Sequence, residues 1–375
     1  MPICSSIALA SEKSHLGRSW ENGIMRALLS SITLDMLEHD RFKRIPVLLI
    51  LFTYAITISV ESILIEFLTT TFLQITPIML SAISITLAGI MLILVASFLM
   101  KKKRISALFL KSGKNLFLAS IFLAVGIFTW YDSINRIGAS KEVLIAGPLE
   151  IVIIVILARL FLNEKLKKIQ VTGIVLALIG FFISIVSDIG TDVLDGMQTV
   201  ITSPLPSIPI TFGDIEAILS AFGFGIGVLF LTKLVSLHSS IEVAGTSMLV
   251  SGLILAGFMV GFSYESLQIS LVVEGSLFQQ PQMWINTIII VAPFSLLPFI
   301  GSLSYSTGLS RIGASITATV GSSSILITVI IQITLRQLGI TSNLPENIIL
   351  AIIGGIIGFL GIYIIRLHNY SCQLT

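Results

Sequence analysis

Charged residues are scarce in this sequence. They make up 11% of its 375 residues, whereas 55% are hydrophobic; a typical soluble domain carries about 25% charged residues. A soluble protein of this composition could not cover its surface with polar groups, so we expect lipid to be its solvent. The net charge is only +2, and no dense basic patch interleaves with aromatic residues. Nucleic acid is therefore not an expected partner.

Cysteines and catalytic signatures are also nearly absent. The two cysteines, Cys4 and Cys372, lie near opposite ends of the chain, so they form neither a metal-ligand spacing nor a disulfide framework. There is no P-loop pattern GxxxxGK[ST], which argues against a nucleotide-driven pump. No zincin or GxSxG pattern occurs. We therefore expect no enzyme activity, no metal site and no cofactor.

Long apolar runs are what the sequence does contain. Runs of roughly 20 residues can cross a hydrocarbon core of ~30 Å as helices. We predict ten such helices, at residues 46–67, 77–100, 115–135, 142–162, 169–188, 213–235, 241–262, 284–307, 314–336 and 347–366. The predicted fold is an all-α polytopic membrane protein.

The rest of the chain divides around these helices. Acidic residues and three prolines mark residues 189–212 as a solvated linker between two halves. The predicted organisation is a disordered or membrane-surface tail (1–44), a first repeat (45–188), an extracytoplasmic linker (189–212), a second repeat (213–366) and a cytoplasmic tail (367–375). For the first tail, alternatives are an amphipathic surface helix over 24–37 and a true start at Met25 or Met36.

Positive charge is distributed unevenly over the predicted ends of the helices. With the N-terminus inside, 16 of the 22 Lys and Arg residues lie near inner membrane ends, and only Arg136, Lys141 and Arg336 lie near outer ones. Basic residues are enriched on the cytoplasmic side of membrane proteins. We therefore predict a multi-pass protein of the plasma membrane with both termini in the cytoplasm.

An internal repeat relates the two halves. The pentapeptide Arg-Ile-Gly-Ala-Ser occurs at 136–140 and at 311–315, and the pair Gly173/Gly180 recurs as Gly354/Gly361. We expect these glycines and Pro148 to have structural roles. Because each half has five helices, the second half enters the membrane from the opposite side, which predicts two inverted five-helix repeats. Such repeats suit alternating access by a transporter, although they also occur in channels.

A carboxylate within a membrane helix is costly, by ~2.5–3.5 kcal/mol on insertion scales, and so needs a reason. Glu150 lies near the middle of the fourth predicted helix, two residues after Pro148. Proline donates no amide N–H and bends a helix, leaving the carbonyl of Leu144 for a cavity. Glu150 is thus a candidate for proton coupling or for binding a cargo amine, and the alternative is a hydrogen bond between helices.

Three residues of the first predicted helix share one face. Tyr54, Thr57 and Glu61 recur at helical spacing and form a polar stripe. They bind cargo or form hydrogen bonds between helices. We expect Glu66, closer to the outer surface, to be solvated.

Polar residues also gather near the outer end of the third predicted helix. Asp132 could bind cargo, or pair with Arg136 or Lys141, and Trp130 could stack on a cargo ring or belong to the interfacial aromatic belt. At the starts of the fourth and sixth helices, Glu142 and Asp214 are expected to serve as capping residues.

The second half offers hydroxyl groups. Tyr305, Ser323 and Ser324 are candidates to contact cargo, and the two serines align with the segment around Pro148 in the first half. Small hydroxyl residues there permit close helix packing or donate hydrogen bonds to cargo.

Four motifs together resemble a known domain. Arg136-Ile-Gly-Ala-Ser, Gly147-Pro148-Leu149, Leu162-Asn163-Glu164-Lys165 and the Gly173 to Gly180 spacing are similar to an EamA-type domain of the drug/metabolite transporter superfamily. This resemblance covers residues 46–366 and is strongest over 130–188. It implies ten helices in two repeats, cytoplasmic termini, and transport of an unnamed cargo. The second half departs from the pattern, since Ser323 and Gly339 stand where Pro148 and Glu164 would align.

The predicted function is therefore secondary active transport of a small metabolite or drug, with proton coupling suggested by the carboxylates. Cargo would bind near the membrane midplane, contacted by the first, third, fourth, sixth, eighth and ninth helices. The alternative is a scaffold or sensor that retains the transporter fold without transporting. Glycine-rich faces on the sixth and tenth helices permit a homodimer.

Overall fold

The fold was analysed in a computed structural model of the chain. It describes residues 49–71, 75–99, 105–162, 168–187, 210–269, 281–312, 314–340, 343–345 and 347–371. The predicted first tail and nearly all of the predicted linker lie outside these residues, as does the end of the second tail.

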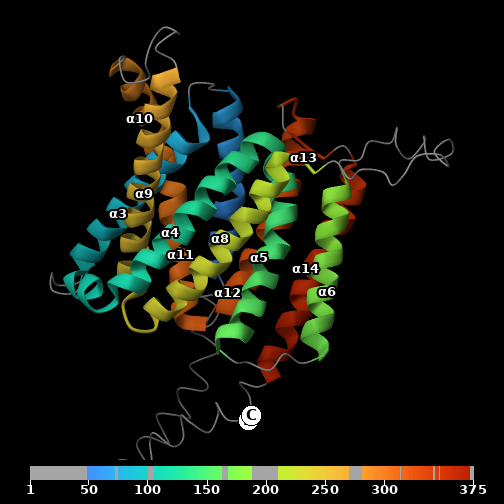
Figure 1. The fold of residues 1–375 in the computed structure, drawn as a ribbon. Helices are drawn as coiled ribbons and strands as arrows, with labels where there is room; N and C mark the ends of the chain where they lie inside the picture. The colour runs from blue at the N-terminus through green and yellow to red at the C-terminus, as the bar shows by residue number, and fades with distance from the viewer. Residues whose placement is uncertain are drawn as a thin grey trace, which may run out of the picture. The chain divides into compact units, whose positions relative to one another are not determined.

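Every regular element among the described residues is a helix. After an unlabelled helix, Leu49–Thr71, the order is α3 (Pro77–Leu99), α4 (Ile105–Ile137), α5 (Ala139–Leu162), α6 (Lys168–Val186), α8 (Phe212–Val235), α9 (Ser240–Ile269), α10 (Pro281–Phe294), α11 (Leu296–Ile312), α12 (Ala314–Gly321), α13 (Ser324–Gln337) and α14 (Ile348–Ser371). Figure 1 shows them as one bundle.

Six of the described helical stretches are long and apolar enough to cross a membrane, and three shorter apolar helices accompany them. The prediction of an α-helical membrane protein is therefore confirmed. The arrangement as ten spans in two inverted repeats stays a prediction.

Three predicted helices contain a break or a kink in the structure. The eighth is two helices, α10 and α11, separated at Ser295. Pro293 and Pro298 flank this break, and neither can donate the amide hydrogen bond that a continuous helix needs. The ninth is interrupted between α12 and α13, where the Ser323 hydroxyl donates to the carbonyl of Val320 and competes with the backbone pattern. The third begins at Ile105, earlier than predicted, and is kinked at Ser112.

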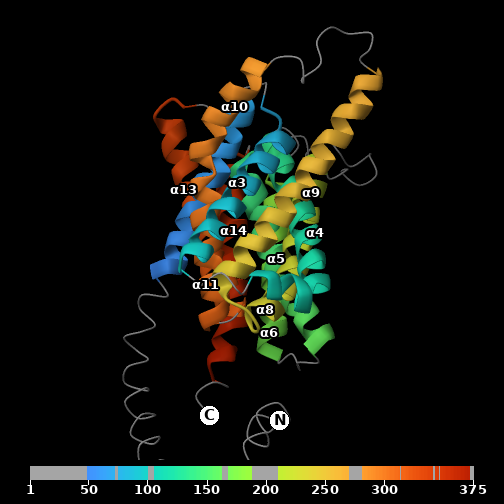
Figure 2. The same cartoon turned by 90° about the vertical axis from the view of Figure 1, so that its left-hand side faces the viewer.

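The helices pack as pairs from opposite halves of the chain. α3 packs against α9, α4 against α8, and α6 against α14; Figures 1 and 2 show α3 and α9 side by side. Glycines allow close approach: a Cβ atom at Gly180 would lie 2.3 Å from the backbone nitrogen of Gly358, and one at Gly361 would lie 2.6 Å from the carbonyl oxygen of Gly173. Gly354 belongs to the same contact, opposite Ser184.

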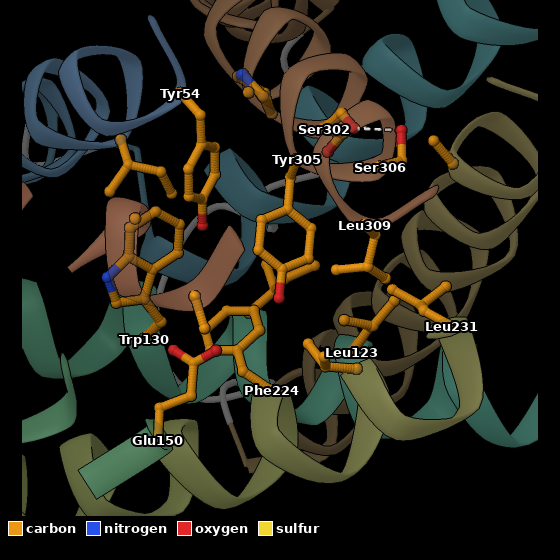
Figure 3. A pocket seen from close by; sticks show the side chains of 18 of the residues that line it. Tyr54, Leu123, Trp130, Glu150, Phe224, Leu231, Ser302, Tyr305, Ser306 and Leu309 are labelled. Carbon is orange, nitrogen blue, oxygen red and sulfur yellow. Dashed lines mark hydrogen bonds between the residues drawn. The ribbon is translucent and has the colours of Figure 1, made fainter. Parts of the chain in front are cut away.

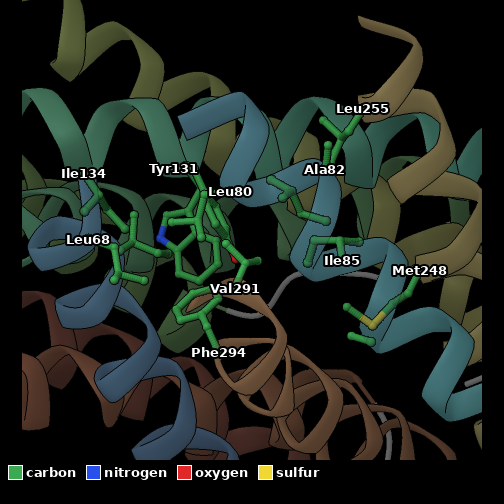
Figure 4. Close-up of a cluster of buried hydrophobic side chains, with 14 of the residues drawn as sticks. Leu68, Leu80, Ala82, Ile85, Tyr131, Ile134, Met248, Leu255, Val291 and Phe294 are labelled. Atoms are coloured by element: carbon green, nitrogen blue, oxygen red, sulfur yellow. The ribbon is translucent and has the colours of Figure 1, made fainter. Parts of the chain in front are cut away.

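A buried apolar cluster joins the two halves beside these pairs (Figure 4). It contains Leu68, Leu80 and Tyr131 from the first half and Val291 and Phe294 from α10. Tyr131 is fully buried, and its ring stands edge-on to Phe294, with centroids 6.5 Å apart. The cluster thereby fixes the position of the Tyr131 hydroxyl.

Candidate functional site

A cavity of about 200 Å³ lies among helices of both halves. Its walls come from the helix Leu49–Thr71 and from α3, α4, α5, α8, α9, α11, α12 and α13, and most of the lining side chains are apolar. Every helix expected to contact cargo borders this cavity, and α3 and α9 border it as well. Figure 3 shows part of its lining, including Tyr54, Glu150 and Tyr305.

Among the candidate residues, Glu150 lines this cavity from α5. Its carboxylate points into the cavity, towards the hydroxyl groups of Tyr54 and Tyr305 (Figure 3). It accepts no hydrogen bond from the described residues. α5 continues as a helix through Pro148, which packs close to Gly358 of α14. The carboxylate is thus held on a helix yet left available to a ligand.

Two tyrosines from opposite halves lie together at the cavity. The ring centroids of Tyr54 and Tyr305 are 5.0 Å apart, at an interplanar angle of 47°. The Tyr305 hydroxyl is buried without a hydrogen-bond partner among the residues that the structure describes. Burying a hydroxyl unpaired is costly, so this group can be satisfied by a polar atom of a ligand.

The two other carboxylates of the lining are already hydrogen-bonded. Glu61 accepts from the Tyr131 hydroxyl at 2.9 Å. Glu142 accepts from the indole N–H of Trp130 at 3.1 Å and from the hydroxyl of Ser220 at 3.3 Å. Instead of only capping α5, as expected, Glu142 is 1% exposed and lines the cavity. Sequence reasoning missed this role, because the start of a helix is also where a capping carboxylate belongs.

Three of the predicted site residues do not line the cavity. The Thr57 hydroxyl donates to the carbonyl of Thr53 at 2.7 Å, and Ser323 lies at the break between α12 and α13. Asp132 pairs with Arg136, with a nitrogen–oxygen distance of 2.9 Å. Ser324, the residue after Ser323, does line the cavity, and its backbone carbonyl accepts a hydrogen bond from the Ser59 hydroxyl at 3.1 Å.

Ion pairs hold the helix ends next to Asp132. Arg136 also contacts Glu216, at 3.0 Å, and Lys141 contacts Asp214 at 2.8 Å. At the start of α8 the N-cap is Thr211, three residues before the expected Asp214, and Asp214 lies at N3, where it completes a capping box with Thr211. Three ion pairs thus lie where α4 ends and where α5 and α8 begin.

A further polar network connects the halves at this same end. We call it the end network, and it consists of Glu66, Ser140, Gln332 and Asn343. The Glu66 carboxylate accepts from the amide N–H groups of Ala139, at 2.9 Å, and Asn343, at 2.6 Å, and from the side-chain amide of Gln332. The Gln332 oxygen in turn accepts from the amide N–H of Ser140 at 3.0 Å.

The end network corrects the expectation for Glu66. Its side chain is 4% exposed instead of solvated. Gly138 enables the approach of the two halves, because it has a φ of +83° and a Cβ there would lie 2.5 Å from the carbonyl oxygen of Asn343. No local sequence pattern predicts this contact, since Glu66 and Asn343 are 277 residues apart.

Comparisons with known proteins agree with the motifs of the first half. Residues 45–186 match the model of the EamA-like transporter family. No curated protein matches the chain. Among 26 matching chains of solved structures, one described only as "Crystal structure of protein" superimposes with a TM-score of 0.53 at 16% identity, covering 86% of this chain and 96% of its own length. That likeness concerns the fold alone. Residues 45–186 of this chain thus match the EamA-like transporter domain, which is the domain of the drug/metabolite transporter superfamily.

Proposed function

We propose that this protein is a secondary transporter that carries a small organic molecule across the plasma membrane by alternating access between two inverted halves. The observation that carries the proposal is the cavity between helices of both halves, which exposes the carboxylate of Glu150 without a hydrogen-bond partner among the described residues. A mid-membrane carboxylate beside a cavity is typical of cargo or ion pathways.

The pairing of helices supports the inverted repeat. In the predicted numbering, α3 with α9 is the second helix with the seventh, and α6 with α14 is the fifth with the tenth. A two-fold axis in the membrane plane brings such equivalent helices together. The contact of α4 with α8, third with sixth, has its counterpart in the first helix with the eighth, where Tyr54 packs on Tyr305 and Leu51 lies close to Gly308.

One end of the bundle is closed and the cavity extends towards the other. The end network ties the helix Leu49–Thr71 and α5 to α13 and Asn343. The cavity lining reaches Val235 at the end of α8 and Val243 near the start of α9. Under the predicted topology the closed end is extracytoplasmic, so this conformation faces the cytoplasm, and cargo exchange on the other side requires the end network to open.

Glu150 is the coupling residue of this proposal. A carboxylate within the membrane is neutralised either by a proton or by bound cargo, so occupancy by one displaces the other. Glu61 and Glu142 face the same cavity, but their oxygens are engaged by Tyr131, Trp130 and Ser220.

The test begins with cargo identification. Thermal stability of the purified protein is measured against amino acids, nucleotides, nucleotide sugars, polyamines and cationic drugs, because a ligand at ~100 times its dissociation constant stabilises the folded state by about 2.7 kcal/mol. The stabilising compound is then offered to proteoliposomes with and without a pH gradient.

We expect gradient-dependent uptake by the parent protein and its loss in Glu150→Gln. The matched control is Glu242→Gln, a buried glutamate of α9 that does not line the cavity. Unchanged uptake and an unchanged pH profile in Glu150→Gln would remove Glu150 from the mechanism. Failure of every compound to be transported, with a stable protein that tolerates loss of both Glu150 and Glu61, would favour the scaffold or sensor.

A further inference from the structure

The ionisable side chains of the cavity all have one sign. Glu61, Glu142 and Glu150 line it, and none of the described lining residues is Lys, Arg or His. The nearby cationic groups at the closed end are engaged elsewhere, since Arg136 contacts Asp132 and Glu216 and Lys141 contacts Asp214. An anionic cargo would find no countercharge here, and it would meet up to three carboxylates in a low-dielectric setting.

The three carboxylates differ in what they offer a ligand. Glu61 and Glu142 accept hydrogen bonds from protein groups, whereas Glu150 accepts none from the described residues. A charge taken out of water needs a partner. When Glu150 is ionised, a positive group brought in by the ligand would supply that partner.

Aromatic rings surround the space in front of Glu150. Figure 3 shows Tyr54, Trp130, Phe224 and Tyr305 at the cavity. The negative face of an aromatic ring attracts an ammonium group within ≈ 6 Å, and aromatic cages bind such cations. The hydroxyl of Tyr305, which is buried and has no hydrogen-bond partner in the described part of the chain, adds an oxygen that can accept from an N–H group.

The size of the cavity limits the body attached to that cation. At about 200 Å³ it is smaller than ligand sites of ≈ 300–1,000 Å³ for drug-sized molecules. Apart from the groups already named, its walls are mainly aliphatic, with residues such as Ile127, Val228 and Leu231. A single ring or a short branched chain suits this space better than a polar sugar or nucleotide.

We propose that the cavity binds a small organic monocation, with its ammonium group against Glu150 and its apolar or single-ring body among Tyr54, Phe224 and Tyr305. A small organic monocation would be the cargo of the transporter proposed above. The proposal rests on that function only where it says that the bound cation is transported. Binding itself is measured separately, so the two can fail independently.

The experiment uses three probes that share a phenyl ring and a two-carbon chain but differ in charge: phenethylammonium, 2-phenylethanol and phenylacetate. Binding to the full chain in lipid nanodiscs is measured at neutral pH by titration calorimetry. We expect phenethylammonium to bind at least tenfold more tightly than either other probe. Glu150→Gln should weaken its binding roughly tenfold or more, because a charge-assisted hydrogen bond is lost. Glu150→Asp should retain most of the preference for the cation, and Glu242→Gln should bind as the parent does.

Each outcome separates the two proposals. Equal or tighter binding of phenylacetate or 2-phenylethanol, or no binding of phenethylammonium to folded protein, overturns the cation site whatever is transported. A cation preference that survives Glu150→Gln also overturns it. Glu150-dependent binding of phenethylammonium without uptake into proteoliposomes supports the cation site while counting against its role as cargo in transport.

Discussion

Replacing Glu66 by alanine should open the closed end of the bundle. The substitution removes the acceptor of the buried amide N–H of Ala139, 2.9 Å from the carboxylate, and of the partly buried amide N–H of Asn343, 2.6 Å from it. Leaving a buried donor unsatisfied costs ≈ 1–3 kcal/mol. The Ala139 donor alone therefore costs about 1–3 kcal/mol, and the bonds from Asn343 and Gln332 add to it, so we expect a loss of about 2 kcal/mol.

Hydrogen exchange of these amides measures that cost directly. A loss of about 2 kcal/mol makes local opening roughly 30-fold more frequent, since 1.4 kcal/mol is tenfold in an equilibrium constant. Mass spectrometry of the protein in nanodiscs should show this acceleration in peptides that contain Ala139 and Asn343. Glu66→Gln is the matched variant, because its amide oxygen still accepts one N–H group, and its effect should be smaller.

Two results would refute this reasoning. Unchanged exchange in both peptides would mean that Glu66 does not hold the amides. An equal increase along the whole chain, including the α6–α14 contact, would mean that Glu66 supports the entire fold instead of this end. The proposed transport cycle adds that Glu66→Ala should shift the protein towards the state open at this end.

Two further substitutions probe the packing and the buried charges. Gly180→Ala should lower the unfolding free energy by about 1–3 kcal/mol, because its Cβ would lie 2.3 Å from the backbone of Gly358. In the control Gly257→Ala the Cβ would meet no described atom within 4 Å, so the unfolding free energy should stay unchanged or rise by up to about 1 kcal/mol. Equal losses in both variants would refute the close helix contact. Lys141→Met should lower the unfolding free energy, measured by chemical denaturation, by about 3–5 kcal/mol, because it removes the cation 2.8 Å from the buried Asp214. Adding Asp214→Asn should recover part of that loss. Additive effects of the two substitutions would argue against the ion pair.

The helix break between α10 and α11 and the burial of Glu66 and Glu142 could not be predicted from the sequence. Prolines 293 and 298 were visible in the sequence, yet whether a membrane helix bends or separates at proline depends on which neighbours satisfy the released carbonyls. Glu142 looked like a capping residue from its position, and Glu66 looked solvated from its distance to the helix end. Both are buried, since hydrogen-bond donors from other helices offset the cost of removing them from water.

The sequence by itself determined the solvent, the helical class and the local pairs. Few charges and long apolar runs require helices in lipid, because in hydrocarbon a helix satisfies its own backbone groups. The pairing of Asp132 with Arg136, one of the roles that the sequence left open, has the helical spacing of four residues. The capping box of Thr211 and Asp214 at α8 has the spacing of three residues. Only the tertiary structure decided which carboxylate stays available. The partners of Glu61 and Glu142, Tyr131 and Ser220, are 70 and 78 residues away along the chain, and their contacts form only when helices pack.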